Sequence, residues 1–287
     1  MKSVTLDYAN MLSPNLGNGG LDPAELEGER SEMFLRVFQT VEESRRSGDM
    51  GFFSLPEAME RAAAIQEVAD GFGQWFENLV VLGIGGSALG TITLRDALLG
   101  PHWNELDDEA RDHYPRLFVL DNVDPRSVSS LMDRLDLRKT LLNVVSKSGS
   151  TAETMSQYLV VEGRLTEALG TEPARGHFLF TTDPESGALR EIADAEGIPS
   201  LEVPRNVGGR FSVLSAVGLL PAAVVGIDIH RVLDGARSMA ERCRNPVLSQ
   251  NPGGILAVLL HHADTEQGAP IHVLMPYSDR LRSFAAW

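Results

Sequence analysis

The chain has 287 residues, of which 43% are hydrophobic and 6% are aromatic, so it can bury a substantial core and form more than one domain. Its 25 lysine and arginine residues against 40 aspartate and glutamate residues give a formal net charge of −15, which disfavours nucleic acid and anionic membrane surfaces as partners. A small phosphorylated ligand remains possible, because backbone amides and a helix N-terminus can hold a phosphate whatever the net charge.

The cysteine content and the lack of long apolar runs indicate in which cellular compartment the protein is expected. Cys243 is the single cysteine, so the chain cannot form an intramolecular disulfide. One cysteine without a second one nearby also provides too few ligands to suggest a zinc site. Residues 1–20 lack the apolar run of a signal peptide, and no later stretch approaches the roughly 20 apolar residues of a spanning helix. We therefore expect a cytoplasmic protein.

The first part of the chain predicts capped helices. Asp22 lies where an N-cap is expected, and Glu25 completes a capping box, so a helix is predicted to run to about Arg46. The segment Ser54–Glu57 repeats this pattern and predicts a second helix. We expect a helical arm over residues 1–55, and the second helix has apolar positions at helical spacing: Ala58, Ala62, Ile65 and Ala69.

From residue 78 onward, short apolar runs alternate with helical patterns. Such runs are typical of strands buried on both faces, and the alternation indicates parallel βαβ units. The fold class is therefore α/β, a doubly wound parallel sheet in a three-layer αβα sandwich. The predicted strands are 79–82, 117–120, 141–145 and 178–180, with helices at 87–99, 125–135, 152–169 and 184–195.

The remainder of the chain predicts linking helices and the start of another sheet. We expect the first α/β domain to span 56–226, and 227–287 to hold linking helices and the incomplete start of a second such domain. Helical patterns cover 212–225, 229–244 and 253–263, a strand is predicted at 271–275, and a helix is predicted to start at Ser278.

A glycine-rich segment, Gly83 to Gly90, follows the first predicted strand. Its unhindered backbone and the N–H groups of the next helix can hold an anion. Gly83, Gly85 and Ala88 also satisfy a G-x-G-x-x-A dinucleotide fingerprint, so a nicotinamide-dependent dehydrogenase is an alternative. The acidic residue expected about 20 positions later is best matched by Asp121, which lies too far along the chain. A purely structural turn is the third interpretation.

A second loop, Ser146 to Thr151, carries four hydroxyls between a predicted strand and a helix. Hydroxyl donors and a helix N-terminus suit a terminal phosphate monoester. Ser150 and Glu153 also fit an S-x-x-E capping box, so the loop could serve only to start the helix. A cap needs one hydroxyl rather than four, which favours phosphate binding.

A third motif, Val207 to Ser212, places Arg210 directly after a glycine pair. A guanidinium held in this way can stabilise a developing oxyanion, as enolisation requires. Taken alone, the pattern is more typical of a solvated surface arginine.

Together the three motifs resemble the glucose-6-phosphate isomerase family, whose members carry two sugar-isomerase (SIS) domains. The resemblance covers nearly the whole chain. It rests on motifs in the family's order: Gly85-Gly86-Ser87, Ser146-Lys147-Ser148-Gly149-Ser150-Thr151 with Glu153-Thr154, Gly208-Gly209-Arg210-Phe211-Ser212, and Pro276-Tyr277-Ser278-Asp279-Arg280-Leu281.

The resemblance implies an aldose–ketose isomerase of carbohydrate metabolism, in glycolysis and gluconeogenesis. It interconverts glucose 6-phosphate and fructose 6-phosphate through a cis-enediol, without a metal or organic cofactor. Arg210 would stabilise the charge that develops at C1–C2. The residues implied to bind the sugar phosphate are Gly86, Ser87, Ser146, Lys147, Ser148, Ser150 and Thr151.

The same resemblance implies that the general base lies outside these residues. The family's base is a glutamate in a Glu-Ser-x-Gly-Lys type segment beyond Trp287, and no histidine of the chain is assigned to ring opening. Glu153 is expected to be a helix cap. We therefore expect the 287-residue chain alone to be inactive, and the full-length protein to be a homodimer.

Two alternatives stay open at this stage. A non-catalytic SIS-domain regulator would bind a sugar phosphate through similar loops. An isomerase of a related sugar, such as mannose 6-phosphate or an amino-sugar phosphate, would also share them, because the motifs recognise phosphate and enediolate rather than the C2 substituent.

Overall fold

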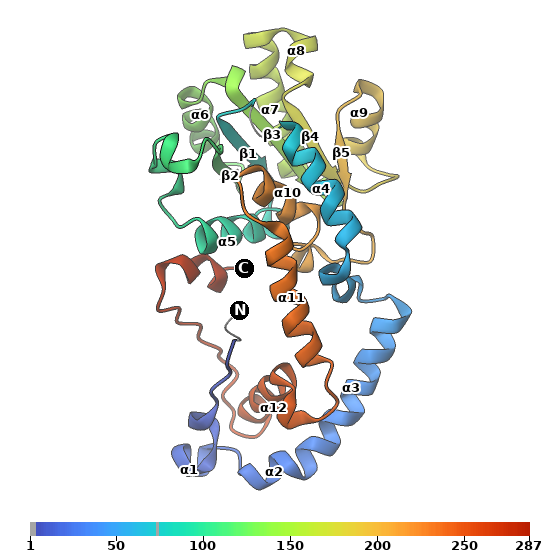
Figure 1. Ribbon diagram of the computed structural model, residues 1–287, viewed down its shortest axis with the longest axis vertical. Coiled ribbons are helices and arrows are strands. Elements are labelled where there is room, and N and C mark those ends of the chain that lie inside the picture. The colour runs from blue at the N-terminus through green and yellow to red at the C-terminus, as the bar shows by residue number, and fades with distance from the viewer. Residues whose placement is uncertain (1–3, 73–74) are drawn as a thin grey trace. The chain divides into compact units, whose positions relative to one another are not determined.

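The computed structural model describes residues 4–72 and 75–287, which form two compact units (Figure 1). Unit 1 contains the described residues up to Phe53 together with Asp234–Leu274, and unit 2 contains Ser54–Leu233 and Met275–Trp287. The domain boundaries expected from the sequence stay a prediction, and parts of the first two domains, residues 1–3 and 73–74, lie outside the described residues.

Unit 2 is built on a parallel five-stranded sheet with the order β2-β1-β3-β4-β5, which confirms the predicted fold class. The four predicted strands are present, each extended by one or two residues. The short β5 at the sheet edge has no buried residue, so its sequence carries no run of buried apolar positions. The strands are β1 (Asn78–Leu82), β2 (Arg116–Leu120), β3 (Thr140–Ser146), β4 (Phe178–Thr182) and β5 (Ser200–Glu202).

Helices cover both faces of this sheet, as Figure 1 shows. Successive side chains of a strand point to opposite faces. Leu79 and Val81 of β1 therefore pack in one core with α4 and α10, whereas Val80 and Leu82 pack in the other with α6, α7 and α9. The helices are α4 (Met59–Phe72), α5 (Leu89–Leu98), α6 (Pro125–Arg134), α7 (Ala152–Leu169), α8 (Thr171–Arg175), α9 (Ala188–Glu196) and α10 (Ala216–Val224).

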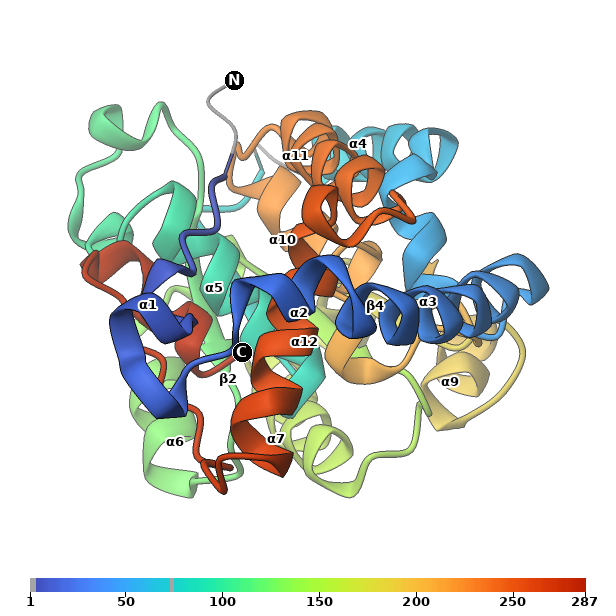
Figure 2. The same ribbon diagram turned by 90° about the horizontal axis from the view of Figure 1, so that it is seen from below.

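In unit 1, helix α12 (Pro252–Thr265) lies against α3 (Glu29–Ser47), as Figure 2 shows. The approach is close at Gly254, where an added Cβ would lie 2.4 Å from Cε2 of Phe34. The remaining helices of the chain are α1 (Ser13–Leu16), α2 (Pro23–Glu27) and α11 (Ile229–Cys243), which passes from unit 2 into unit 1. No helix among the described residues is both long and apolar enough to cross a membrane.

The predicted N-terminal helix begins as expected but is interrupted. Asp22 accepts a hydrogen bond from the Ala24 N–H at 2.9 Å, which confirms the cap. The capping box is wrong, because the Glu25 carboxylate instead pairs with Arg30 at 2.9 Å. The Arg30 guanidinium is largely buried and also pairs with Glu266 at 2.7 Å, so it needs both counter-charges. Gly28 separates α2 from α3.

The second predicted helix starts later than expected. A 3₁₀ segment, Gly51–Glu57, contains Pro56 and buries Leu55, and the α-helix begins only at Met59. The apolar positions predicted for this helix face the core as expected, except that Ala58 lies before its start: Ala62, Ile65 and Ala69 are buried.

The strand predicted at 271–275 is wrong. These residues form no strand in the structure, and Ile271 and Val273 are 83% and 71% exposed. A strand requires a neighbour for its backbone hydrogen bonds, and none of the described strands pairs with this segment. The helix predicted from Ser278 is a 3₁₀ segment, Asp279–Ala285, which packs on α5.

Candidate functional site

The strand order creates a switch point between β1 and β3. The chain leaves β1 toward β2 on one side, and then crosses to β3 on the other side. Loops that follow the carboxyl ends of these two strands diverge there, and ligands of doubly wound sheets bind in the resulting crevice. The loops in question are residues 83–88 and 147–151, so the fold brings the first two sequence motifs to the same crevice.

The hydroxyls of the second loop bind one another. Ser146 ends β3 and is 1% exposed, and its Oγ lies 3.0 Å from Oγ1 of Thr151. Ser148 Oγ lies 3.3 Å from the same atom and accepts a 3.3 Å hydrogen bond from the Ser150 N–H. Thr151 is the residue before α7 and makes no side-chain cap. The Ser150–Glu153 capping box is therefore wrong, and the hydroxyls form a polar cluster at the N-terminus of an 18-residue helix.

This hydroxyl loop is held in shape by residues at the start of α9. A Cβ at Gly187 would lie 2.3 Å from the carbonyl oxygen of Ser148, so only glycine allows the two backbones to meet. The Leu189 N–H donates to the Gly149 carbonyl at 3.0 Å. The loop is thus fixed before any ligand is bound.

The first loop packs against the third through bare backbone. Residues Gly85–Ser87 form a 3₁₀ turn before α5. A Cβ at Gly86 would lie 2.4 Å from the carbonyl carbon and oxygen of Gly209, and 3.0 Å from the backbone nitrogen of Arg210. Ser87 is half-buried, and its hydroxyl has no hydrogen-bond partner in the described chain. The fold therefore joins all three motifs.

Arg210 lies in a 3₁₀ turn, Gly209–Phe211, rather than at the mouth of a helix. The next helix, α10, begins only at Ala216, after a turn in which the Ser215 hydroxyl donates to the Ser212 carbonyl at 2.6 Å. The Arg210 side chain is exposed and makes no ion pair or hydrogen bond with the described residues. Its guanidinium is therefore available to an anionic ligand.

Comparison with known proteins assigns the family. A family model described as phosphoglucose isomerase matches residues 60–287. A glucose-6-phosphate isomerase of Carboxydothermus hydrogenoformans is 43% identical over 99% of this chain and 61% of its own length. One of Rubrobacter xylanophilus is 42% identical over 100% of this chain and 64% of its own length. The chain belongs to the phosphoglucose isomerase family. It spans about three fifths of the length of these curated relatives.

Solved structures agree with this family assignment. A hypothetical protein of Thermus thermophilus is 38% identical with a TM-score of 0.80, over 92% of this chain and 60% of its own. A glucose-6-phosphate isomerase of Chlamydia trachomatis is 26% identical with a TM-score of 0.69, over 79% of this chain and 42% of its own. Membership of the phosphoglucose isomerase family leaves the dinucleotide fingerprint at Gly83, Gly85 and Ala88 as a coincidence of spacing.

Lys147 makes contacts that its sequence position does not reveal. Its Nζ donates to the carbonyl oxygens of Arg205 and Val207, both at 2.8 Å. Both carbonyls belong to the segment that leads to Arg210. Direct contact between Lys147 and a phosphate stays a prediction.

An ion pair at the same sheet edge was missed in the sequence. Asp183 follows β4 directly and accepts hydrogen bonds from Arg205 Nε at 3.2 Å and Nη2 at 3.1 Å. The carboxylate also accepts from the N–H groups of Glu185 and Ser186 at 2.9 and 3.0 Å. The Arg205 guanidinium, with these N–H groups, holds the pKa of Asp183 far below its ordinary range. The available signal was its position, because Asp183 follows β4 as Lys147 follows β3.

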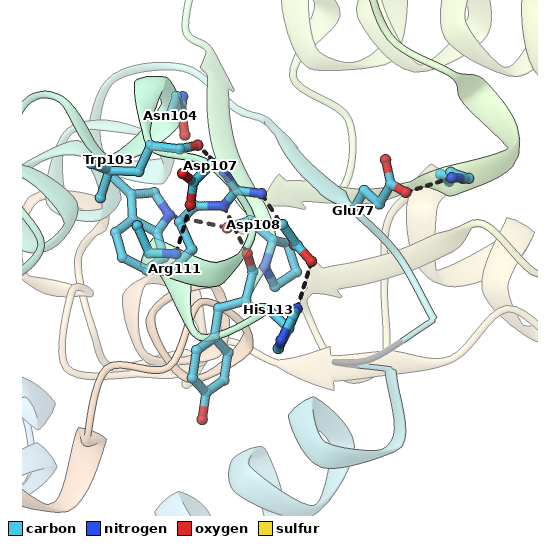
Figure 3. Close-up of polar contacts among 12 residues, drawn as sticks. Glu77, Trp103, Asn104, Asp107, Asp108, Arg111 and His113 are labelled. Atoms are coloured by element: carbon cyan, nitrogen blue, oxygen red, sulfur yellow. Dashed lines mark hydrogen bonds and ion pairs between the residues drawn. The ribbon is translucent and has the colours of Figure 1, made fainter.

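A second polar cluster lies in the loop before β2, at the amino end of that strand, and Figure 3 shows its side chains. The buried Arg111 donates to the carbonyls of Leu106 and Tyr114 and lies 3.4 Å from Asp108. Asp108 also binds His113 at 2.5 Å and raises the pKa of that imidazole. Arg111, Asp108 and His113 are thus linked within the loop, and the cluster anchors the chain as it enters β2.

Proposed function

We propose that this chain provides the phosphate-binding and anion-stabilising part of an aldose–ketose isomerase that interconverts glucose 6-phosphate and fructose 6-phosphate. The observation that carries the proposal is the meeting of a hydroxyl cluster, a glycine loop and the unpaired Arg210 at the β1/β3 switch point. Family membership and the names of the curated relatives support the reaction class and the substrates.

The phosphate would lie over the N-terminus of α7. The hydroxyls of Ser146, Ser148, Ser150 and Thr151 are donors there, and the free N–H groups of the first helical turn add a favourable field. On the facing loop, Gly86 offers its backbone and Ser87 its unpartnered hydroxyl. Hydrogen bonds to a charged phosphate are worth about 1.5–3 kcal/mol each, so a few of them suffice for a specific site.

Arg210 would bind the other end of the opened sugar. An enediolate places negative charge on O1 and O2, and an exposed guanidinium without a protein counter-ion can follow that charge as it forms. Proton transfer is assigned to no residue of this chain. The contribution of these loops is therefore to bind, orient and stabilise charge.

Direct titration tests the proposal. Fructose 6-phosphate should bind the chain measurably in isothermal titration calorimetry, whereas fructose and a nicotinamide dinucleotide should not. Thr151→Val keeps the side-chain shape but removes the hydroxyl that contacts both Ser146 and Ser148, and should weaken sugar-phosphate binding about tenfold or more.

The matched control is Ser156→Ala. The Ser156 hydroxyl lies one turn along α7 and donates only to the Ala152 carbonyl at 2.7 Å, so its removal should leave the affinity unchanged. Equal losses in the two variants, or tighter binding of the dinucleotide than of fructose 6-phosphate, would contradict the proposed site.

Binding of an enediolate mimic distinguishes an isomerase from a sugar-phosphate sensor. A five-carbon sugar acid phosphate carries a planar carboxylate where the enediolate oxygens form, and an isomerase site binds such a mimic more tightly than substrate. Arg210→Met should abolish that preference while inorganic phosphate still binds. Equal affinity for the mimic and fructose 6-phosphate in the unmodified chain favours a sensor.

We also place the complete protein in the cytoplasm as a homodimer, and this stays part of the proposal. The single cysteine among these 287 residues fits a reducing compartment. Light scattering on the full-length protein should give twice the monomer mass, and a monomer would contradict the assembly.

A further inference from the structure

Lys147 connects two loops of the site. It follows β3 directly, and its extended side chain reaches the segment 203–207, which follows β5. An ammonium group has three donors, and two of them here bind the carbonyls of Arg205 and Val207 at 2.8 Å each. Val207 is itself fully buried, so the segment is fixed at that point. The Lys147 ammonium is therefore directed at backbone rather than free in the crevice.

A second tie holds the same segment from β4. The Arg205 guanidinium binds the Asp183 carboxylate through Nε and Nη2, and it also pairs with Glu185 at 2.9 Å. Asp183 is in turn fixed by two backbone N–H groups. Arg205 is thus held through its carbonyl by Lys147 and through its side chain by Asp183.

The segment needs such ties because two glycines separate it from Arg210. Gly208 and Gly209 connect Val207 to Arg210, and glycine loses more backbone freedom on ordering than any other residue. On one side, the close approach of Gly86 limits the position of Gly209. On the other side, the Lys147 ammonium holds the Val207 carbonyl. The Gly208 and Gly209 carbonyls accept hydrogen bonds from the N–H groups of Phe211 and Ser212, which belong to the same turn as Arg210 and move with it.

We propose that Lys147 is a positioning residue, whose ammonium fixes the loop that presents Arg210, and that this ammonium does not bind the sugar phosphate. The Asp183–Arg205 pair supports the same loop. The expected effect of Lys147 on ligand binding rests on the function proposed above. The hydrogen bonds between Lys147 and the loop are present in the chain without any ligand.

The test compares two variants with a matched control. Lys147→Met keeps the length of the side chain without its donors, and Lys147→Arg restores donors that can reach both carbonyls. Lys139→Met is the control, because Lys139 lies at the other end of β3 and pairs with Glu77 on the surface. Each protein is measured by amide hydrogen exchange and by titration with inorganic phosphate and with the sugar acid phosphate.

Amide exchange reports the tie without any ligand. In Lys147→Met, the amides of residues 205–211 should exchange about tenfold faster or more, while those of 147–151 stay within about twofold. Lys147→Arg should recover most of the protection, and Lys139→Met should change neither segment. An unchanged exchange rate at 205–211 overturns the positioning role, whatever the ligands do.

The two ligands separate positioning from direct phosphate contact. If Lys147 acts through Arg210, Lys147→Met weakens binding of the sugar acid phosphate about tenfold more than it weakens binding of inorganic phosphate. In a protein that already carries Arg210→Met, adding Lys147→Met should then weaken binding no further. Equal weakening of both ligands overturns the inference, because it shows direct contact with phosphate. If the unmodified chain binds neither ligand, the proposed function fails, and hydrogen exchange alone decides the positioning role.

Discussion

Replacing Gly86 with alanine puts a methyl group where two backbones already touch. The added Cβ would lie 2.4 Å from both the carbonyl carbon and the carbonyl oxygen of Gly209. Carbon atoms in van der Waals contact lie about 3.5–4.0 Å apart, so the overlap exceeds about 1 Å. Because the opposing atoms are backbone, no side-chain rotation relieves the clash, and the glycine loop must move away from the Arg210 loop.

The expected cost follows from that overlap. Overpacking a well-packed site costs about 1–3 kcal/mol, and each kcal/mol shifts the Tm of a chain of this size by roughly 2–4 °C. Thermal unfolding followed by circular dichroism should therefore show a decrease of about 2–12 °C. The separation of the loops should also weaken sugar acid phosphate binding about tenfold, because its two ends would no longer be held together.

The matched control is Gly163→Ala on the exposed face of α7. Apart from the adjacent residues and the backbone of the surrounding helical turns, no atom lies within 4 Å of a Cβ added there. Alanine in a helix interior is favoured over glycine by about 0.5–1 kcal/mol, so this variant should be slightly more stable. If Gly86→Ala unfolds and binds like the unmodified chain, the two loops do not pack together and the reasoning about the composite site is refuted.

Three further outcomes follow from the structure. Arg205 lowers the pKa of Asp183, so the contribution of this carboxylate to stability is fully present above the ordinary aspartate pKa of about 3.9 and is lost as the pH falls below it. Asp183→Asn should therefore make stability depend less on pH in the acid range. An unchanged acid dependence would refute this. Burial raises the pKa of Tyr158 to about 12, so its share of stability is complete below the ordinary tyrosine pKa of about 10 and is lost as pH rises toward the folded value. The ultraviolet absorbance of the Tyr158 phenolate should therefore appear only as the pH approaches about 12, and Tyr158→Phe should remove this increase in absorbance. Gly254→Ala, whose Cβ would lie 2.4 Å from Phe34, should destabilise unit 1 by about 1–3 kcal/mol, measured by hydrogen exchange within α12; protection equal to that of the unmodified chain would show that α3 and α12 are not in close contact.

Local pattern was sufficient for the framework of unit 2. Runs such as Leu79–Leu82 and Leu141–Val145 are buried on both faces, so the strands appear in sequence as continuous apolar segments. The motifs directly after β1 and β3 could therefore be placed at the carboxyl ends of strands. That these two loops form one crevice depends on the strand order, which the sequence does not state.

Tertiary context decided the features that local pattern described wrongly. Glu25 had the spacing of a capping box, but the buried Arg30 required a counter-charge and took its carboxylate. The segment 271–275 had the composition of a strand, but a strand exists only where a neighbour accepts its hydrogen bonds. Local propensity is worth tenths of a kcal/mol per residue, whereas an unpaired buried charge such as that of Arg30 costs several times more.

The amino-acid sequence by itself determined the fold class, the family and the hydroxyl and glycine motifs, because these depend on residue type and short spacing. Only the tertiary structure determined that Gly86 touches Gly209, that the Lys147 ammonium binds the carbonyls of Arg205 and Val207, and that Asp183 pairs with Arg205. Those contacts join residues between 22 and 123 positions apart, and the direction of a lysine side chain or the packing of two loops is set by the strands that carry them.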